Sequence, residues 1–554
     1  MTSSSSIRKT FSRLRKAAPV SPVVLTMLTI IFVFCTYNAT FWSIAADVFT
    51  GHPLSLAGYM SALFFLTLAA FSFLAFPWIV KPFLGFIVVL SSVTSYFMDS
   101  LGVIIDRDMI QNAAVTTFSE SKHLITLGFV THVVVFGILP AIVILSVKIK
   151  SQGRLKTFGV PVLTILLSLS LFVGLLMADL KSYASILRER KDFMNSFQPG
   201  APLVGATRYV KLMSRTANVK VTPVGQDAKK GASYVVGGKP VLTIVVAGET
   251  ARAQNFSLNG YGVDTNPKLA MLPIINFSDV SSCGTATAVS LPCMFSKYGR
   301  DDFSYEKGVS NENLVDVLGY AGLHVEWWDN NTGDKGISDR AVSRSFSHTE
   351  NDEFCAAGEC MDGIFIQALK EYAQTITTDT VLVLHDIGSH GPTYYLRYPE
   401  EFERFTPACR TAEFKNCTPQ EITNAYDNTI AYTDEILAQT IEFLRAQDQL
   451  TTALLYVSDH GESLGEAGLY LHGAPYFLAP EFQIKVPMIL WMSDGFQDKF
   501  SISQDCLADK NNASLSHDNL FHSLLGMLDI KTNVHNADLD IFATCRTEQK
   551  VASR

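Results

Sequence analysis

Acidic and imidazole side chains follow directly after short apolar runs in the C-terminal half of this 554-residue chain. Glu249 follows the run VLTIVVAG and Asp459-His460 follow ALLYVS, while His390 and His472 stand a little beyond other runs. Carboxylates and imidazoles are the ligands that zinc and similar divalent cations bind. Taken alone, Asp459-His460 would also suit a cap or a hydrogen-bonded loop pair. Together, the five side chains predict a metal site.

A metal site without a nearby catalytic cysteine needs another attacking group, and the segment SCGTATAVSLPC offers hydroxyls. Thr285 and Thr287 stand there at the start of a predicted helix, whose free amides and dipole favour an anion. A threonine oxygen on zinc would lose its proton near neutral pH and could attack phosphorus. Ordinary Ser/Thr capping is the competing interpretation, which the flanking Cys283 and Cys293 make less persuasive.

The elements that must position these side chains are short and continuously apolar. Continuous rather than alternating hydrophobicity is typical of strands buried on both faces, as in a parallel sheet sandwiched by helices. Ligands of such α/β domains bind beyond the carboxyl ends of the strands. We therefore predict an α/β catalytic domain over residues 236–554. Its predicted strands are Val241–Ala247, His324–Trp328, Thr380–Leu384, Ala453–Val457 and Val486–Met492.

The first 180 residues predict a different structure. Five long stretches there lack Asp, Glu, Lys and Arg, and about 20 apolar residues suffice to span a bilayer. We predict a five-helix transmembrane domain over residues 1–180, with spans near 21–43, 55–77, 80–101, 124–147 and 158–178. Residues 181–235 form a bridge, in which the basic, amphipathic Lys181–Phe197 would lie on the membrane surface.

Basic residues predict the orientation of these spans. Ten Lys and Arg flank one side of the predicted spans, five of them before the first span, whereas the opposite loops hold only Arg107 and Lys122. The positive-inside rule then places the N-terminus in the cytoplasm and the C-terminal domain outside. Eight of the nine cysteines lie in that domain, and their close spacing predicts local disulfides. The predicted pairs are Cys283/Cys293, Cys355/Cys360, Cys409/Cys417 and, less firmly, Cys506/Cys545.

The distribution of charged residues argues against nucleic-acid binding and against a transporter or receptor. Residues 181–554 contain 32 Lys+Arg against 46 Asp+Glu, which is unfavourable for binding nucleic acid. A transporter or a receptor with an exported sensor domain would need charged or broken spans. The almost charge-free stretches argue against that interpretation.

Six motifs occur in an order that resembles one known family. They are GET (248–250), SCGTATAVSLPCMFS (282–296), NNTGDKG (330–336), GSHGPTYY (388–395), SDHGESLGE (458–466) and YLHG (470–473). The chain is similar to the phosphoethanolamine transferases of Gram-negative inner membranes, which include the mobile colistin-resistance enzymes. These belong to the alkaline phosphatase/sulfatase superfamily, and the resemblance covers essentially the whole chain.

The resemblance implies a role for each matching residue. Glu249, Thr287, Asp459 and His460 would hold the catalytic zinc, with Thr287 as the nucleophile. Thr285 and Thr250 remain alternatives that the sequence alone does not exclude. The residues that would receive the phosphoethanolamine group or assist proton transfer are Asn331, Thr332, Lys335, His390 and His472. Asn112, Thr116 and Glu120 match a lipid-facing helix and fall on one helical face, although a solvated loop helix would show the same spacing.

The implied reaction transfers phosphoethanolamine from phosphatidylethanolamine to lipid A through a covalent intermediate on Thr287. One zinc ion is expected and a second is possible, with Glu462 either a ligand of the second or a solvated turn residue. Either His390 or His472 could protonate the leaving diacylglycerol and activate the acceptor. The modified surface would carry less negative charge and bind cationic peptides such as polymyxin more weakly. We expect a monomer in the inner membrane.

Alternative substrates remain open within the same superfamily. Core heptose, Kdo or a periplasmic glucan would use the same catalytic residues as lipid A. A glycerol-phosphate transferase like lipoteichoic acid synthase is a further alternative, since it also has five spans and a threonine nucleophile. The NNTGDKG and GSHGPTYY segments favour phosphoethanolamine.

Overall fold

A computed structural model describes residues 18–117, 121–183, 193–235, 238–346, 349, 351, 353–356 and 359–547. By contacts between residues the chain divides into two compact units. The helical unit comprises residues 1–107 and 125–207, and the catalytic unit comprises residues 108–124 and 208–554. Glu120, the basic residues before the first span, and the 184–192 part of the predicted amphipathic helix lie outside the described residues.

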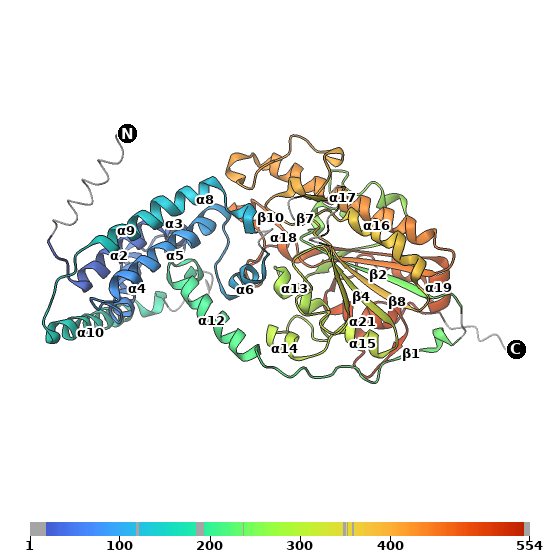
Figure 1. The fold of residues 1–554 in the computed structure, drawn as a ribbon, viewed down its shortest axis with the longest axis horizontal. Helices are drawn as coiled ribbons and strands as arrows, with labels where there is room; N and C mark the ends of the chain where they lie inside the picture. The colour runs from blue at the N-terminus through green and yellow to red at the C-terminus, as the bar shows by residue number, and fades with distance from the viewer. Residues whose placement is uncertain are drawn as a thin grey trace. The chain divides into compact units, whose positions relative to one another are not determined.

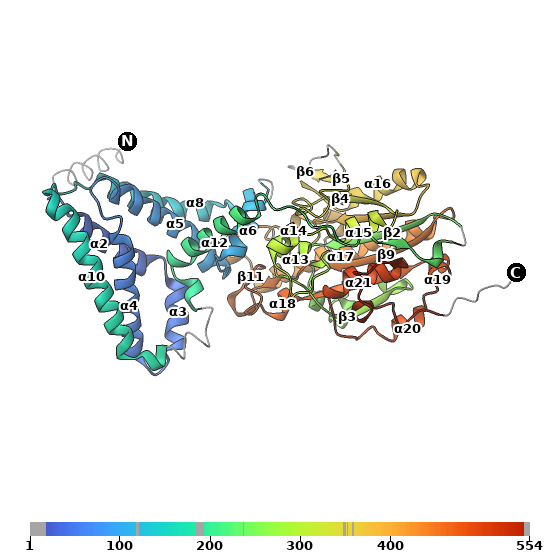
Figure 2. The same cartoon turned by 90° about the horizontal axis from the view of Figure 1, so that it is seen from below.

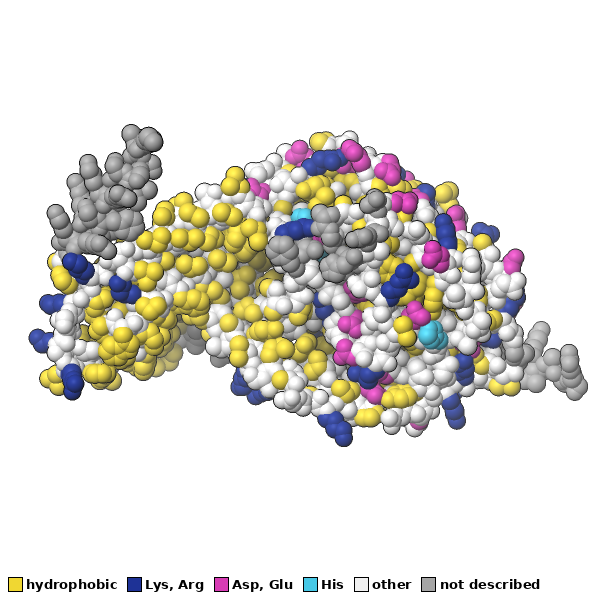
Figure 3. Space-filling view, in the orientation of Figure 1, with side chains coloured by type: hydrophobic (Ala, Val, Ile, Leu, Met, Phe, Trp, Pro, Cys, Tyr) yellow, Lys and Arg dark blue, Asp and Glu magenta, His cyan; other side chains and the backbone are white. Residues whose placement is uncertain are grey.

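The helical unit contains four helices that are long and apolar enough to cross a membrane, within the residues described. They are α4 (Pro53–Ser72), α5 (Val80–Leu101), the stretch Leu127–Ser146 and α10 (Arg154–Ala178). The third consists of α8 (Leu127–His132), a π-helical turn (Val133–Ile138) and α9 (Leu139–Ser146). Figure 3 shows hydrophobic side chains over most of the visible face of this unit. These four predicted spans are confirmed as apolar helices.

The first predicted span is a bent pair rather than one straight helix. α2 (Pro22–Thr36) and α3 (Ala39–Val48) meet at 72°, so the unit has five spans only if the pair counts as one. The break lies at Asn38, whose side-chain amide donates to Val33 O and Gln198 O while its Oδ1 accepts from Gln198 N. A buried amide that bonds another segment interrupts the helical ladder, which explains the bend without glycine or proline.

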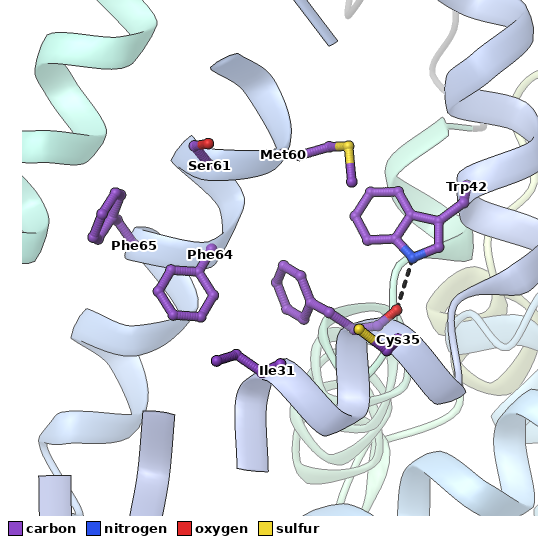
Figure 4. Close-up of a pocket in the computed structure, with 8 residues that line it drawn as sticks. Ile31, Cys35, Trp42, Met60, Ser61, Phe64 and Phe65 are labelled. Atoms are coloured by element: carbon purple, nitrogen blue, oxygen red, sulfur yellow. Dashed lines mark hydrogen bonds between the residues drawn. The ribbon is translucent and has the colours of Figure 1, made fainter. Parts of the chain in front are cut away.

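An apolar groove of about 360 Å³ lies between the bent pair and α4 (Figure 4). Aromatic and aliphatic side chains line it, and the indole N–H of Trp42 is satisfied by Phe34 O at 2.7 Å. Cys35 also lines the groove. All nine cysteines lie within the described residues, and Cys35 alone is outside the four disulfides. The four predicted disulfide pairs are therefore confirmed.

The catalytic unit is built around an eight-stranded sheet in the order β13-β3-β12-β9-β2-β8-β4-β5, in which β13 (Leu515–Ser516) is a two-residue edge strand. Its strands include all five predicted ones, with bounds β2 (Val241–Gly248), β4 (His324–Asp329), β8 (Thr380–His385), β9 (Thr451–Ser458) and β12 (Lys485–Met492). Strands β9, β2, β8, β4 and β5 (Val342–Ser345) run parallel. β12 runs antiparallel to both neighbours, β9 and β3 (Ile275–Ser281). The sheet is thus mostly parallel, as predicted, with β12 as the exception.

Helices cover both faces of this sheet (Figures 1 and 2). Val245, Val383 and Leu455 pack on one face in a single buried cluster with α13 (Thr287–Met294), α15 (Leu314–Tyr320) and α21 (Asp518–Met527). α16 (Gly363–Tyr372) and the 27-residue α17 (Pro419–Arg445) cover the other face. Buried strands β2 and β9 are apolar on both faces for this reason. The layered arrangement leaves the strand ends open to polar side chains.

Two further helices lie outside the apolar helices and the sheet domain. α12 (Gly200–Thr216) occupies part of the bridge expected over 181–235, and the division between the two units falls within it. α6 (Arg107–Val115) begins the segment 108–124, which groups with the catalytic unit although it lies between two apolar helices in the sequence. The segment that carries the predicted lipid-facing residues therefore belongs to the catalytic unit.

Candidate active site

Glu249 and Asp459 lie together because β2 and β9 pair in parallel register. Gly248 stands opposite Ser458, so each acidic residue is the next one beyond a matched strand end. Backbone amides fix the carboxyl group of Asp459. Asp459 Oδ1 accepts from the amides of Thr250 at 3.2 Å and His460 at 2.7 Å. Thr250 adopts a left-handed φ of 59° to make this turn, a conformation that costs energy and occurs mostly at functional sites.

Thr287 is the hydroxyl that faces these acids. Its Oγ1 lies 3.0 Å from Glu249 Oε2 and 3.3 Å from His460 Nε2, and it is buried at the first turn of α13. The two alternatives are placed differently. Thr285 donates its hydroxyl to Ala474 O at 2.6 Å, and Thr250 donates to Glu249 Oε1 but forms no hydrogen bond with His460 among the described residues. The geometry therefore favours Thr287, the residue that the resemblance indicates.

His460 presents a free lone pair to the same point. Its Nδ1 lies 2.9 Å from Gly461 O, which can only accept, so Nδ1 carries the proton and Nε2 does not. Burial, with His472 nearby, lowers the pKa of His460 to about 3. The imidazole is consequently neutral at pH 7, which is the form that binds a metal ion.

The side chains of Glu249, Asp459 and His460 fit a divalent cation. Their ligand atoms all lie within 4.8 Å of one another, and they are the one such group among the described residues. Asp459 Oδ2 is buried without a hydrogen-bond partner in the described part of the chain. Burial and the neighbouring Glu249 raise the pKa of Asp459 well above its ordinary value. Two buried carboxylates with one orphaned oxygen need a positive charge between them, which a metal ion would supply.

Asn331 joins this centre from the end of β4. Its amide donates to Glu249 Oε2 at 2.8 Å and to Asp386 O at 2.9 Å. His385 Nδ1 donates to Asp329 Oδ2 at 2.8 Å, which leaves His385 Nε2 as an acceptor 3.3 Å from the Asn331 amide. Sequence reasoning did not assign Asp329 or His385, although both end apolar runs. They orient Asn331 toward Glu249.

Of the remaining predicted residues, Thr332 and Lys335 follow Asn331 in the chain, whereas Asn112 and Thr116 belong to the segment of α6. Lys335 Nζ donates to both oxygens of Thr332, at 2.8 and 2.6 Å, so its charge lies beside the residue that follows Asn331. Asn112 lies in α6, and Thr116 follows the last helical residue but still donates its hydroxyl to Asn112 O at 2.7 Å. Among the described residues, no hydrogen bond joins Asn112 or Thr116 to Glu249 or Asp459, and Glu120 lies outside the described residues.

His390 and His472 gather at the edge of the same centre. The ring centroids of His472 and His460 are 4.4 Å apart, and those of His472 and His390 are 5.7 Å apart. Three imidazoles, two carboxylates and one hydroxyl therefore converge on one point beyond the carboxyl ends of β2, β8 and β9. This combination suits activation of a hydroxyl for attack on phosphorus, with imidazoles placed to move protons.

Comparisons with known proteins agree with this chemistry. A sulfatase family model matches residues 242–530, and a model described as phosphoethanolamine transferase EptA/EptB matches residues 63–213. Phosphoethanolamine transferase EptA of Escherichia coli strain K12 is 40% identical over 481 residues, which cover 85% of this chain and 87% of the relative. The chain belongs to the phosphoethanolamine transferase family.

Further relatives are similar to this chain over nearly its full length. Phosphatidylethanolamine transferase Mcr-1 of Escherichia coli is 33% identical over 531 residues, covering 92% of this chain and 95% of Mcr-1. The solved structure of the integral membrane protein lipooligosaccharide phosphoethanolamine transferase A from Neisseria meningitidis matches with a TM-score of 0.91 and 35% identity. It covers 94% of this chain and 98% of that one. The predicted family, fold class and enzyme class are confirmed, and the transferase is a membrane protein.

Glu462 of this transferase is not a solvated turn residue. It is fully buried, and its two oxygens accept from Tyr394 OH at 2.6 Å and His472 Nδ1 at 2.9 Å. Because the carboxylate can only accept, His472 carries its proton on Nδ1 and keeps Nε2 basic. Glu462 therefore sets the tautomer of His472, a role that its place in a turn-forming motif did not indicate.

Glu462→Gln is expected to lower kcat by about 10- to 100-fold, because loss of the carboxylate removes the group that orients His472. Steady-state transfer of phosphoethanolamine by the purified full chain measures the change. Glu481→Gln, at an exposed glutamate that begins α18 (Glu481–Ile484), is the matched control and should retain wild-type turnover. An unchanged kcat in Glu462→Gln would show that His472 does not depend on this contact.

Proposed function

We propose that this transferase moves phosphoethanolamine from phosphatidylethanolamine to lipid A, with Thr287 as the nucleophile. The observation that carries the proposal is the approach of Thr287 Oγ1 to Glu249 and His460 in a buried site with one orphaned carboxylate oxygen. The likeness to a lipooligosaccharide transferase at a TM-score of 0.91 supports the class of acceptor.

Glu249, Asp459, His460 and Thr287 would hold one zinc ion. When bound, zinc supplies Lewis acidity that acidifies the threonine hydroxyl and neutralises charge on phosphoryl oxygens. A second zinc ion stays a lesser proposal, because the oxygens of Glu462 already bond Tyr394 and His472.

The side chains of this protein divide the remaining work. Thr287 attacks the donor phosphorus, diacylglycerol leaves, and phosphoethanolamine stays on the threonine oxygen until an acceptor oxygen displaces it. His472 Nε2, which carries no proton at rest, would take the Thr287 proton and give it to the leaving diacylglycerol oxygen; it would later take the acceptor's proton and return it to Thr287. His390 stands next to it and could take either role. Asn331, Thr332 and Lys335 would position the transferring group and supply positive charge. Asn112, Thr116 and Glu120 would contact the lipid.

Membrane anchorage fits lipid substrates, since both would have negligible concentration in water. The proposal places the N-terminus in the cytoplasm and the catalytic unit in the periplasm, outside the inner membrane. Four disulfides in the catalytic unit support an oxidising compartment. The proposal takes the transferase to be a monomer. Added ethanolammonium groups would reduce the negative charge of the outer surface and confer resistance to cationic peptides such as polymyxin.

Mass spectrometry of lipid A from cells with and without this chain tests the proposal. We expect one added phosphoethanolamine group on lipid A, absent in cells that express Thr287→Ala. Modification confined to core heptose, Kdo or a periplasmic glucan would contradict lipid A as the acceptor. Added glycerol phosphate would contradict the donor instead.

A further inference from the structure

The segment 108–124, described over residues 108–117 and 121–124, contacts the rest of the catalytic unit near both of its ends. Near its start, the terminal methyl of Met109 packs against the backbone of Gly473. A Cβ atom added to this glycine would lie only 2.6 Å from that methyl. Gly473 is the residue after His472. Near its end, His123 Nε2 lies 3.1 Å from Glu359 Oε2. The segment that carries Asn112 and Thr116 is therefore held at two points, one of them beside a catalytic histidine.

The second contact, at Glu359, is also connected to a catalytic histidine, because Arg397 bonds both Glu359 and the backbone of His390. This arginine is 3% exposed, and its Nη1 donates to the same Glu359 Oε2 at 3.1 Å. Its Nε donates to His390 O at 2.9 Å. One carboxylate oxygen thus receives a hydrogen bond from the 108–124 segment and another from the guanidinium that holds the His390 loop.

Glu359 is itself fixed in place. It belongs to β7 (Glu359–Cys360), which pairs with β6 (Cys355–Ala356) in a hairpin closed by the Cys355–Cys360 disulfide. The next turn brings Asp362, which accepts from the amides of Ile387 and Gly388 at 2.9 Å each. The hairpin is therefore anchored to the loop that precedes His390, and Glu359 has little freedom to move independently of it.

We propose that Glu359 is a positioning residue of the transferase that links the lipid-facing segment to the catalytic loop. Through Arg397 it fixes the backbone at His390, and through His123 it seats the segment 108–124. The proposal rests on the proposed function for its kinetic consequences. Its structural content, a shared anchor for two segments of the chain, does not depend on the identity of the lipids.

The charges of the three groups are consistent with this role. Burial raises the pKa of Glu359, but Arg397 and His123 outweigh it and the net pKa is lowered, so the carboxylate stays charged. Burial lowers the pKa of His123 and exceeds the opposing effect of Glu359. A neutral imidazole then donates Nε2–H to a buried carboxylate whose charge Arg397 already balances. Removing the carboxylate would leave Arg397 as an unpaired buried charge.

The two arms predict different kinetic effects in the full chain, reconstituted in nanodiscs with phosphatidylethanolamine that bears a fluorescent acyl chain. Release of fluorescent diacylglycerol is measured against the mole fraction of the lipid. His123→Ala should raise KM about tenfold and leave kcat nearly unchanged, because it frees the segment alone. Arg397→Lys should lower kcat by about tenfold or more with little change in KM, because it releases the backbone of His390. Glu359→Gln should change both.

A matched control is the exposed ion pair Arg410–Glu403, in which Arg410 Nη2 lies 2.7 Å from Glu403 Oε2. Arg410→Lys should behave as wild type. Equal effects of His123→Ala and Arg397→Lys on kcat and KM, or wild-type kinetics in Glu359→Gln, would overturn the proposal. Absence of diacylglycerol release by the wild type would instead contradict the proposed function.

Hydrogen exchange decides the structural proposal whatever the lipid. His123→Ala should speed amide exchange within 108–117 while the loop 387–397 keeps its wild-type rates. Arg397→Lys should do the reverse, and Glu359→Gln should speed both. Exchange that rises uniformly over the catalytic unit would indicate general destabilisation and overturn the specific link.

Discussion

Replacing Thr287 with alanine is expected to reduce diacylglycerol release by on the order of 10⁴-fold or more, because the variant lacks the oxygen that attacks phosphorus. The hydroxyl lies within hydrogen-bonding distance of both Glu249 Oε2 and His460 Nε2, at 3.0 and 3.3 Å. Folding should survive, since the methyl group that remains fills part of the same space. Fluorescent lipid turnover measures the loss, and circular dichroism of the purified chain confirms the fold.

Thr285→Ala is the control for this experiment. It removes the hydrogen bond to Ala474 O, at a cost of about 1 kcal/mol in the free energy of unfolding, but it leaves the attacking oxygen in place. Near-normal turnover is therefore expected. A Thr287→Ala variant with wild-type turnover, or an inactive Thr285→Ala variant that is folded, would require another nucleophile.

Loss of the metal ion is the second large effect. Exhaustive chelation should abolish turnover, and added zinc should restore it, because neither Glu249 nor Asp459 forms an ion pair with Lys or Arg in the described part of the chain. The imidazole Nε2 of His460 lies 3.5 Å from an oxygen of each carboxylate, and this ring is neutral at pH 7. Elemental analysis should find about one zinc per chain before chelation and none after it.

Asp459→Asn separates metal binding from folding. The variant should bind no zinc and show no turnover, yet in chelator it should melt at a higher temperature than the wild type. The reason is that asparagine removes one of two buried like charges and the orphaned oxygen. Turnover that persists after complete chelation, or a lower melting temperature of the variant in chelator, would contradict the metal assignment.

The strand ends were predictable because apolar runs report burial. Glu249, Asp459 and His460 follow strands that the sequence marks clearly, and parallel register brings them together without further information. The direction of β12 was not predictable, because a buried run looks the same in either direction. Between β9 and β12 lie the short antiparallel pair β10 (Ser463–Leu464) and β11 (Tyr470–Leu471), a 3₁₀ turn and the four-residue helix α18, none of which is a helix long enough for a parallel crossover. β3 was not predicted because Asn276, Ser278 and Asp279 interrupt its apolar pattern.

Side chains that act by orienting other functional residues were harder to predict from the sequence. Glu462 and Asp329 show no signal of their own, because their role depends on which histidine nitrogen they face. Glu359 is harder still, since its partners come from residues 123 and 397, far apart in the chain. The bend at Asn38 likewise depends on Gln198, and an uncharged apolar run predicts only a straight span.

The lone reduced cysteine gives this transferase a built-in reporter. Because disulfides occupy the other eight thiols, a nitroxide maleimide would attach at Cys35 without engineered substitutions. Cys35 lines the apolar groove beside Trp42. Relaxation of the nitroxide by dissolved oxygen against a water-soluble nickel chelate would then measure its immersion depth, and would tell whether the bent helix pair crosses the bilayer or turns back within it.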